Sequence, residues 1–129
     1  GVPRKKRNEK AVKYIKLVGL EKQMKHMANE MSGGQQQRVG IARALAVDPQ
    51  IIFADEPTGN LDSKTTKEIL GLMRKIVREQ NQTLVMVTHD NYIAGFADRQ
   101  LHIVDGKIFK IEEQHHDDTE EDTENEEER

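Results

Sequence analysis

The sequence predicts a single small α/β domain followed by an acidic tail. Two short apolar segments, residues 51–54 and 83–88, have the composition of buried strands. A stretch with helical periodicity, residues 62–81, lies between them, which is the order of a β-α-β unit with parallel strands. Farther along, two β-type segments flank Asp105-Gly106, a pair typical of a two-residue hairpin turn.

Two helices are predicted before the first strand. Asn8 is the candidate N-cap of the first helix, and Gly19 is placed to end it. Its apolar stripe is Ala11, Val12, Ile15 and Val18. The second helix begins at Ser32, which is spaced from Gln35 as in a capping box, and runs to residues 48–49. Its expected buried stripe is Val39, Ala42, Leu45 and Ala46. Residues 20–31 lack a clean period and predict a turn or short helix with a loop.

The later elements follow the same patterns. We expect the two parallel strands to be buried on both faces, and Asp62 or Ser63 to cap the helix between them. The stripe of that helix is Ile69, Leu72, Met73, Ile76 and Val77. A short helix over residues 92–97 precedes hairpin strands 100–104 and 107–111, which should add an antiparallel edge to the sheet.

Composition excludes several classes of protein. The chain has 129 residues and a net charge of −3, but residues 112–129 hold eleven acidic residues and one arginine, so this segment is expected to be a disordered acidic tail. The absence of cysteine excludes a disulfide scaffold and a thiolate metal site. No signal peptide or membrane span is apparent. With three Phe, two Tyr and no Trp, and with residues 4–7 interpreted as a solvated basic segment, no nucleic acid is expected as a partner.

The segment Ser32-Gly33-Gly34-Gln35 places two glycines in the first turn of a helix. Glycine costs about 1 kcal/mol relative to alanine inside a helix, so a compensating role is expected. Bare backbone at a helix N-terminus lets an anion approach the unpaired N–H groups. A capped helix with a flexible entry explains this segment equally well.

Chemistry-bearing residues also follow the two strands. Asp55 and Glu56 come directly after the first strand and His89 after the second, so they should share the ligand-binding edge of a parallel sheet. Asp55 could hold Mg²⁺, and Glu56 could accept a proton from water. The alternatives are a turn with two solvated acids and a hydrogen-bonded loop histidine.

Taken together, these segments resemble the ATP-binding subunit of an ABC transporter. Residues 31–38 match the signature motif, 51–56 the Walker B strand, 59–62 the D-loop and 88–90 the switch histidine. The amino-acid sequence of residues 54–62 is similar to that of the family branch that exports lipoproteins, macrolides or antimicrobial peptides. The resemblance implies a partial P-loop NTPase core. Residues 1–111 would be the C-terminal portion of the domain, with about 1–47 from the helical subdomain and 48–111 from the catalytic core.

The resemblance also implies site roles. The residues that would contact the γ-phosphate of an ATP held by the opposing subunit are Ser32, Gly33, Gly34 and Gln35. Asp55 would organise Mg²⁺ and Glu56 would be the general base. Asp62 would link the two ATP sites, and His89 would bridge to the γ-phosphate. The implied partners are a second ATPase subunit, identical or paralogous, and membrane permease subunits, which would place the protein in the cytoplasm at the inner face of the membrane.

A P-loop is missing from this sequence. Its pattern needs a second glycine five positions after the first, and none of the nine glycines is followed by one at that spacing. We therefore expect a fragment that does not hydrolyse ATP by itself and whose open strand edges favour self-association. Two alternatives stay open: a non-enzymatic piece that docks on an intact ABC ATPase, and a soluble ABC ATPase of translation or DNA repair.

Overall fold

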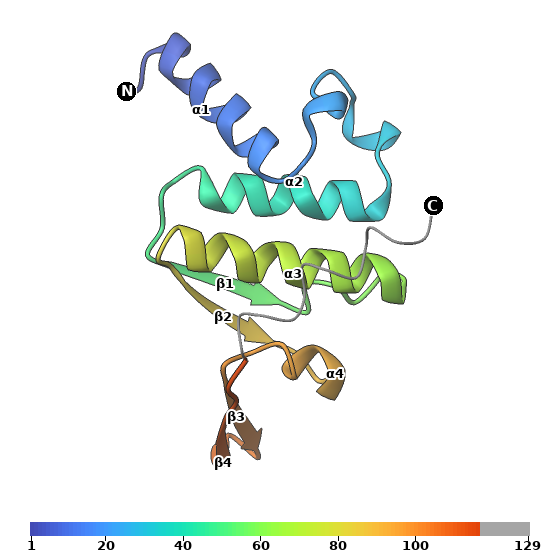
Figure 1. The fold of residues 1–129 in the computed structure, drawn as a ribbon, viewed down its shortest axis with the longest axis vertical. Helices are drawn as coiled ribbons and strands as arrows, with labels where there is room; N and C mark the ends of the chain where they lie inside the picture. The colour runs from blue at the N-terminus through green and yellow to red at the C-terminus, as the bar shows by residue number, and fades with distance from the viewer. Residues whose placement is uncertain (117–129) are drawn as a thin grey trace. The chain divides into compact units, whose positions relative to one another are not determined.

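The computed structural model describes residues 1–116, and the predicted acidic tail falls largely outside them. The chain forms two compact units, residues 1–88 and the part from His89 onward (Figure 1). The boundary between subdomains expected near residue 47 stays a prediction; the helices before it and the strands after it belong to the first unit.

Helix α1 spans Arg4–Leu17 and begins earlier than expected. Pro3 is the N-cap residue, so the prediction that Asn8 caps this helix is wrong. Proline has a fixed φ that suits a helix start, and this favours the earlier boundary. The basic residues 4–7 form the first turn of α1 and are not a segment ahead of it.

Gly19 ends α1 as predicted. Its φ is +73°, in the left-handed region that glycine adopts at low cost. The amide of Leu20 donates to the carbonyl of Ile15 over 3.0 Å, and the amide of Gly19 donates to that of Lys16 over 3.0 Å. This is the Schellman pattern, and it turns the chain so that Leu20 is buried.

Two short 3-10 helices, η1 (Glu21–Gln23) and η2 (Ala28–Glu30), connect α1 to α2 (Gly33–Leu45).

The predicted apolar stripes of α1 and α2 are only partly right. Val12 and Val39 are 36% and 40% exposed, whereas Tyr14, which the pattern did not include, is buried. The reason is that α1 and α2 bury the residues that face each other, and a sequence pattern alone cannot identify that face.

The β-α-β unit is confirmed. Strand β1 (Ile51–Asp55) pairs in parallel with β2 (Thr83–Val87), and Ile51 lies opposite Thr83. Helix α3 (Ser63–Glu79) connects them and buries Ile69, Met73 and Ile76 of its predicted stripe.

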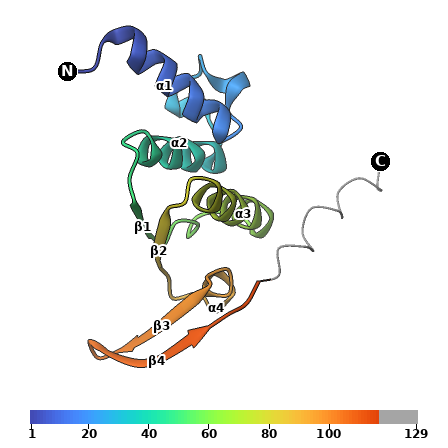
Figure 2. The same ribbon diagram turned by 60° about the vertical axis from the view of Figure 1, so that its left-hand side comes forward.

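The prediction that both faces of this sheet are buried is wrong for this chain. Helices α2 and α3 lie on one side of the β1–β2 pair (Figure 2), and Ile52 on that side packs against the core. On the other face Phe53 is 77% and Val87 is 60% exposed. The strands are apolar on both faces, but residues 1–116 supply cover for only one of them.

The core of the first unit joins the three helices. Its buried residues are Tyr14, Val18, Leu20, Ala42, Leu45 and Ile76.

Beside this core, the hydroxyl of Tyr14 donates a short hydrogen bond to Asp48, and Nζ of Lys10 lies 2.6 Å from the same carboxylate. Asp48 therefore connects the turn after α2 to α1 through two polar contacts. The same contacts raise the pKa of Tyr14 to about 12, chiefly through the hydrogen bond to Asp48, and lower that of Asp48.

The second unit contains α4 (Asn91–Ala94), β3 (Arg99–Val104) and β4 (Lys107–Glu113). The predicted hairpin is present, with Asp105 and Gly106 both at positive φ. Two expectations need correction. The hairpin strands pair with each other in a sheet of their own and not with β1 or β2. Strand β4 also extends through Glu113, where side-chain bonds from His102 and Lys110 to Glu112 hold it, so ordered structure continues beyond residue 111.

Candidate functional site

The predicted phosphate-contacting segment forms the N-terminus of α2. Ser32 is the N-cap, and its Oγ accepts a hydrogen bond from the amide of Gln35 over 3.2 Å. The side-chain oxygen of Gln35 accepts from the amide of Ser32 over 3.1 Å, which completes the predicted capping box. These bonds leave the amides of Gly33 and Gly34 at the positive end of the helix dipole.

Asp62 is the N-cap of α3, so the alternative cap, Ser63, is wrong. The Asp62 carboxylate accepts from the amide of Thr65 over 3.1 Å and from the hydroxyl of Thr65 over 2.5 Å. The Thr65 hydroxyl is the main cause of a lowered pKa at Asp62, and the backbone bond adds to it. Asp62 is thus held as an oriented, charged carboxylate on the surface.

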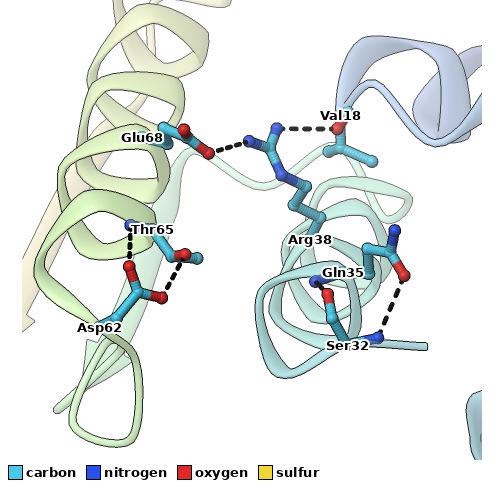
Figure 3. A network of polar contacts seen from close by, with 7 residues as sticks. All are labelled: Val18, Ser32, Gln35, Arg38, Asp62, Thr65 and Glu68. Atoms are coloured by element: carbon cyan, nitrogen blue, oxygen red, sulfur yellow. Dashed lines mark hydrogen bonds and ion pairs between the residues drawn. The ribbon is translucent and has the colours of Figure 1, made fainter.

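The two capped N-termini lie side by side. Helices α2 and α3 run in the same direction, so Ser32 and Asp62 occupy the same end of the pair (Figure 3). One turn farther along, Arg38 connects the helices. Its guanidinium lies 3.6 Å from Glu68 on α3 and donates to the carbonyl of Val18 at the end of α1 over 3.1 Å.

Asp55 and Glu56 stand at the end of β1 in different surroundings: Asp55 belongs to the strand, one residue longer than predicted, and Glu56 follows it. Asp55 is the exposed last residue of the strand. Glu56 is half-buried, and its φ of +42° lies in the left-handed region, which costs a non-glycine residue about 1 kcal/mol. The Glu56 amide donates to the carbonyl of Val87 over 2.9 Å, and the Thr88 hydroxyl donates to Oε2 of Glu56 over 3.2 Å. Backbone conformations of this kind gather at functional sites.

His89 is the first residue of the second unit, whereas Asp55 and Glu56 belong to the first. Its placement beside these acids stays a prediction. Thr88, the residue before it, does join the site through its bond to Glu56.

Two acidic residues, Asp55 and Glu56, stand at the end of β1. Within residues 1–116 there is no group of three or more His, Cys, Asp or Glu side chains that could hold a metal ion. Mg²⁺ in nucleotide enzymes is typically held by one or two carboxylates, the phosphates and water. Asp55 alone could supply the protein ligand for such a site.

Sequence reasoning missed three residues of this region: Thr65, which holds Asp62; Thr88, which bonds Glu56; and Arg38, which bridges α2 and α3. Thr88 was inside a recognised motif, but its partner is 32 positions away. Thr65 lies three residues after the N-cap Asp62, and this spacing could have indicated the contact between the two residues.

The amino-acid sequence is similar to those of known ABC transporter proteins. The sequence pattern of the ABC transporter family matches residues 3–59. The macrolide export ATP-binding/permease protein MacB of Chlorobium phaeobacteroides is 52% identical over 104 residues, which are 81% of this chain and 16% of that protein. The lipoprotein-releasing system ATP-binding protein LolD 1 of Rhodopseudomonas palustris is 47% identical over 108 residues, 84% of this chain and 48% of that protein.

The fold is similar to a solved cassette. The dimeric structure of MJ0796, an ABC transporter cassette, has a TM-score of 0.72 and 44% identity over 88% of this chain and 49% of the cassette. The same cassette has been solved bound to ADP and Pi.

The chain thus spans less than half the length of these relatives. Among residues 1–116, no helix has both the length and the apolar character needed to cross a bilayer. The capping box at Ser32, the acid pair at the end of β1 and the identity to exporter subunits agree. The chain belongs to the ABC transporter family, as a fragment of its ATP-binding domain.

Proposed function

We propose that this chain is the part of an ATP-hydrolysing ABC exporter subunit that activates water and senses the nucleotide of an opposing subunit. It does not itself supply the phosphate cradle, because the sequence contains no P-loop. The observation that carries the proposal is the environment of Glu56. This carboxylate has a left-handed backbone at the end of a parallel strand and a hydrogen bond from the threonine that follows the neighbouring strand.

Glu56 acts as the general base. Its half-buried position and the bond from Thr88 orient the Glu56 carboxylate, which accepts a proton from water. The adjacent Asp55 is exposed at the end of β1 and would hold Mg²⁺ together with the phosphates. Mg²⁺, when bound, neutralises charge that develops on the γ-phosphate.

The N-terminus of α2 approaches the γ-phosphate of ATP held by the other subunit. Its exposed residues Ser32 and Gly33 present donors at the positive helix end. Asp62, at the adjacent helix end, links the two ATP sites, and His89 contacts the γ-phosphate. The dimeric cassette MJ0796 supports an assembly with a second ATPase subunit, identical or paralogous.

The identity to MacB and LolD supports an export role, in which permease subunits hold the ATPase at the cytoplasmic face of the membrane. The cassette solved with ADP and Pi supports ATP as the nucleotide. The isolated chain, without a P-loop, should neither bind Mg-ATP at micromolar concentration nor hydrolyse it.

A composite protein tests this proposal. The chain replaces the corresponding C-terminal portion of a P-loop-bearing exporter ATPase, and ATP hydrolysis is measured with and without Mg²⁺. We expect magnesium-dependent turnover that E56Q reduces at least about 100-fold, as for loss of a general base. The matched control, E79Q, alters an exposed glutamate at the end of α3 and should leave turnover unchanged.

Two results would contradict the proposal. One is equal turnover of the E56Q and parent composite proteins while both retain the parent circular dichroism spectrum. The other is magnesium-dependent hydrolysis by the 129-residue chain alone, which would mean that it holds ATP without a P-loop.

A further inference from the structure

The two glycines after Ser32 are packed against the segment that carries Asp62. A Cβ added at Gly34 would lie 2.5 Å from Cγ2 of Thr65, and one at Gly33 would lie 3.3 Å from Cδ2 of Leu61. Gly40, farther along α2, has nothing within 4 Å of such a Cβ. The missing side chains at Gly33 and Gly34 therefore make room for residues of this same chain.

Thr65 connects this packing to Asp62. Its methyl group faces Gly34, and its hydroxyl donates to Asp62 over 2.5 Å. Threonine is β-branched, so one χ1 angle sets the position of both groups. A residue larger than glycine at position 34 would rotate or displace Thr65, and the hydroxyl would leave Asp62.

The contact between Arg38 and Glu68 is weaker than this packing. The two charged groups are 3.6 Å apart, and the Glu68 side chain is 48% exposed, so solvent screens their attraction. A close approach of backbone to side chain, in contrast, depends on atomic size and is not screened. The Gly34–Thr65 contact, one turn nearer the helix ends, is the tighter constraint on the two N-termini.

We propose that Thr65 is a positioning residue that couples Asp62 to the Ser32–Gln35 turn through its contact with Gly34. When the α2 N-terminus moves, Thr65 follows because its methyl group packs against Gly34, and the Asp62 carboxylate moves with it. Gly34 is then required for packing within the chain, in addition to any contact with nucleotide. Only the roles of Ser32 and Asp62 toward ATP depend on the proposed function; the coupling itself does not.

The test uses the 129-residue chain without nucleotide, so its result does not depend on ATP hydrolysis. The Asp62 carboxyl is titrated by ¹³C NMR in four variants. In G34A, the added methyl displaces Thr65, and the pKa of Asp62 should rise toward its ordinary value. In G34A/T65S the clashing methyl is gone and the hydroxyl remains, so the low pKa should return. In G34A/T65V a methyl remains and the hydroxyl is absent, so the pKa should stay raised. The matched control, G40A, should leave the titration of Asp62 as in the parent chain.

The proposal is overturned if G34A titrates like the parent chain, or if T65S and T65V restore the Asp62 titration equally. If G34A does not fold, folding of the two double variants, measured by circular dichroism, tests the proposal instead. Folding recovered with T65S and not with T65V supports the coupling, and failure of both double variants to fold overturns it.

Discussion

The hydroxyl of Thr88 donates a hydrogen bond to Oε2 of Glu56, and this joins the residues that follow two neighbouring parallel strands. The Glu56 amide also bonds the last carbonyl of β2, so both ends of this residue are fixed to the neighbouring strand. An acid held in this way has one carboxylate oxygen oriented by the protein.

Removal of the Thr88 hydroxyl should slow hydrolysis in the composite protein. A hydrogen bond to a charged group contributes about 1.5–3 kcal/mol, so T88V should lower kcat by about tenfold or more, with a smaller change in KM for ATP. T88S keeps the hydroxyl and serves as the control. Steady-state kinetics that show equal kcat for T88V and T88S would contradict the orienting role.

Alkaline titration should identify Tyr14. Its pKa is raised to about 12 by Asp48, above the ordinary 10.0, so its bond to Asp48 stabilises the fold below pH 10 and this contribution is lost as pH rises toward 12. Tyrosinate absorbance should show one tyrosine that ionises near pH 12, and D48N should lower the pKa of that group. D105N, in the hairpin turn, is the control. Absence of the high transition in the folded parent chain would disprove the contact.

Loss of the α2 cap should destabilise the first unit. S32A removes the acceptor for the Gln35 amide, and a lost N-cap costs about 1 kcal/mol in the free energy of unfolding. S63A is the matched control, because Ser63 stands at the first helical position of α3 and Asp62 is the cap there. Urea unfolding measures both variants, and an equal loss in the two would contradict the assignment of caps.

The uncovered face of the β1–β2 sheet should promote self-association. Phe53 is 77% exposed, and within residues 1–116 each strand pairs along one edge only. F53K should weaken association by about tenfold, the effect of withdrawing one large apolar side chain from a contact. V47K changes a residue that is 76% exposed in the loop before β1 and should have no effect. Light scattering over a concentration series measures both, and a parent chain that stays monomeric would refute the prediction.

The sequence by itself determined the features that depend on neighbouring residues. The capping box of Ser32 and Gln35, the left-handed Gly19 and the Asp105-Gly106 turn are set by side-chain and backbone preferences over a few positions, and all are present. The two apolar segments with a helical stretch between them likewise predicted the parallel pair, which is present.

Only the tertiary structure decided which faces are covered and which distant residues meet. The exposure of Phe53 depends on what lies beyond the sheet, and burial of Tyr14 depends on where α2 crosses α1. The space at Gly34 is filled by Thr65, 31 positions away, and the Glu56 carboxylate meets Thr88, 32 positions away. Such contacts arise when whole helices and strands pack together. They depend on shape complementarity between distant parts of the chain, which no local sequence pattern encodes.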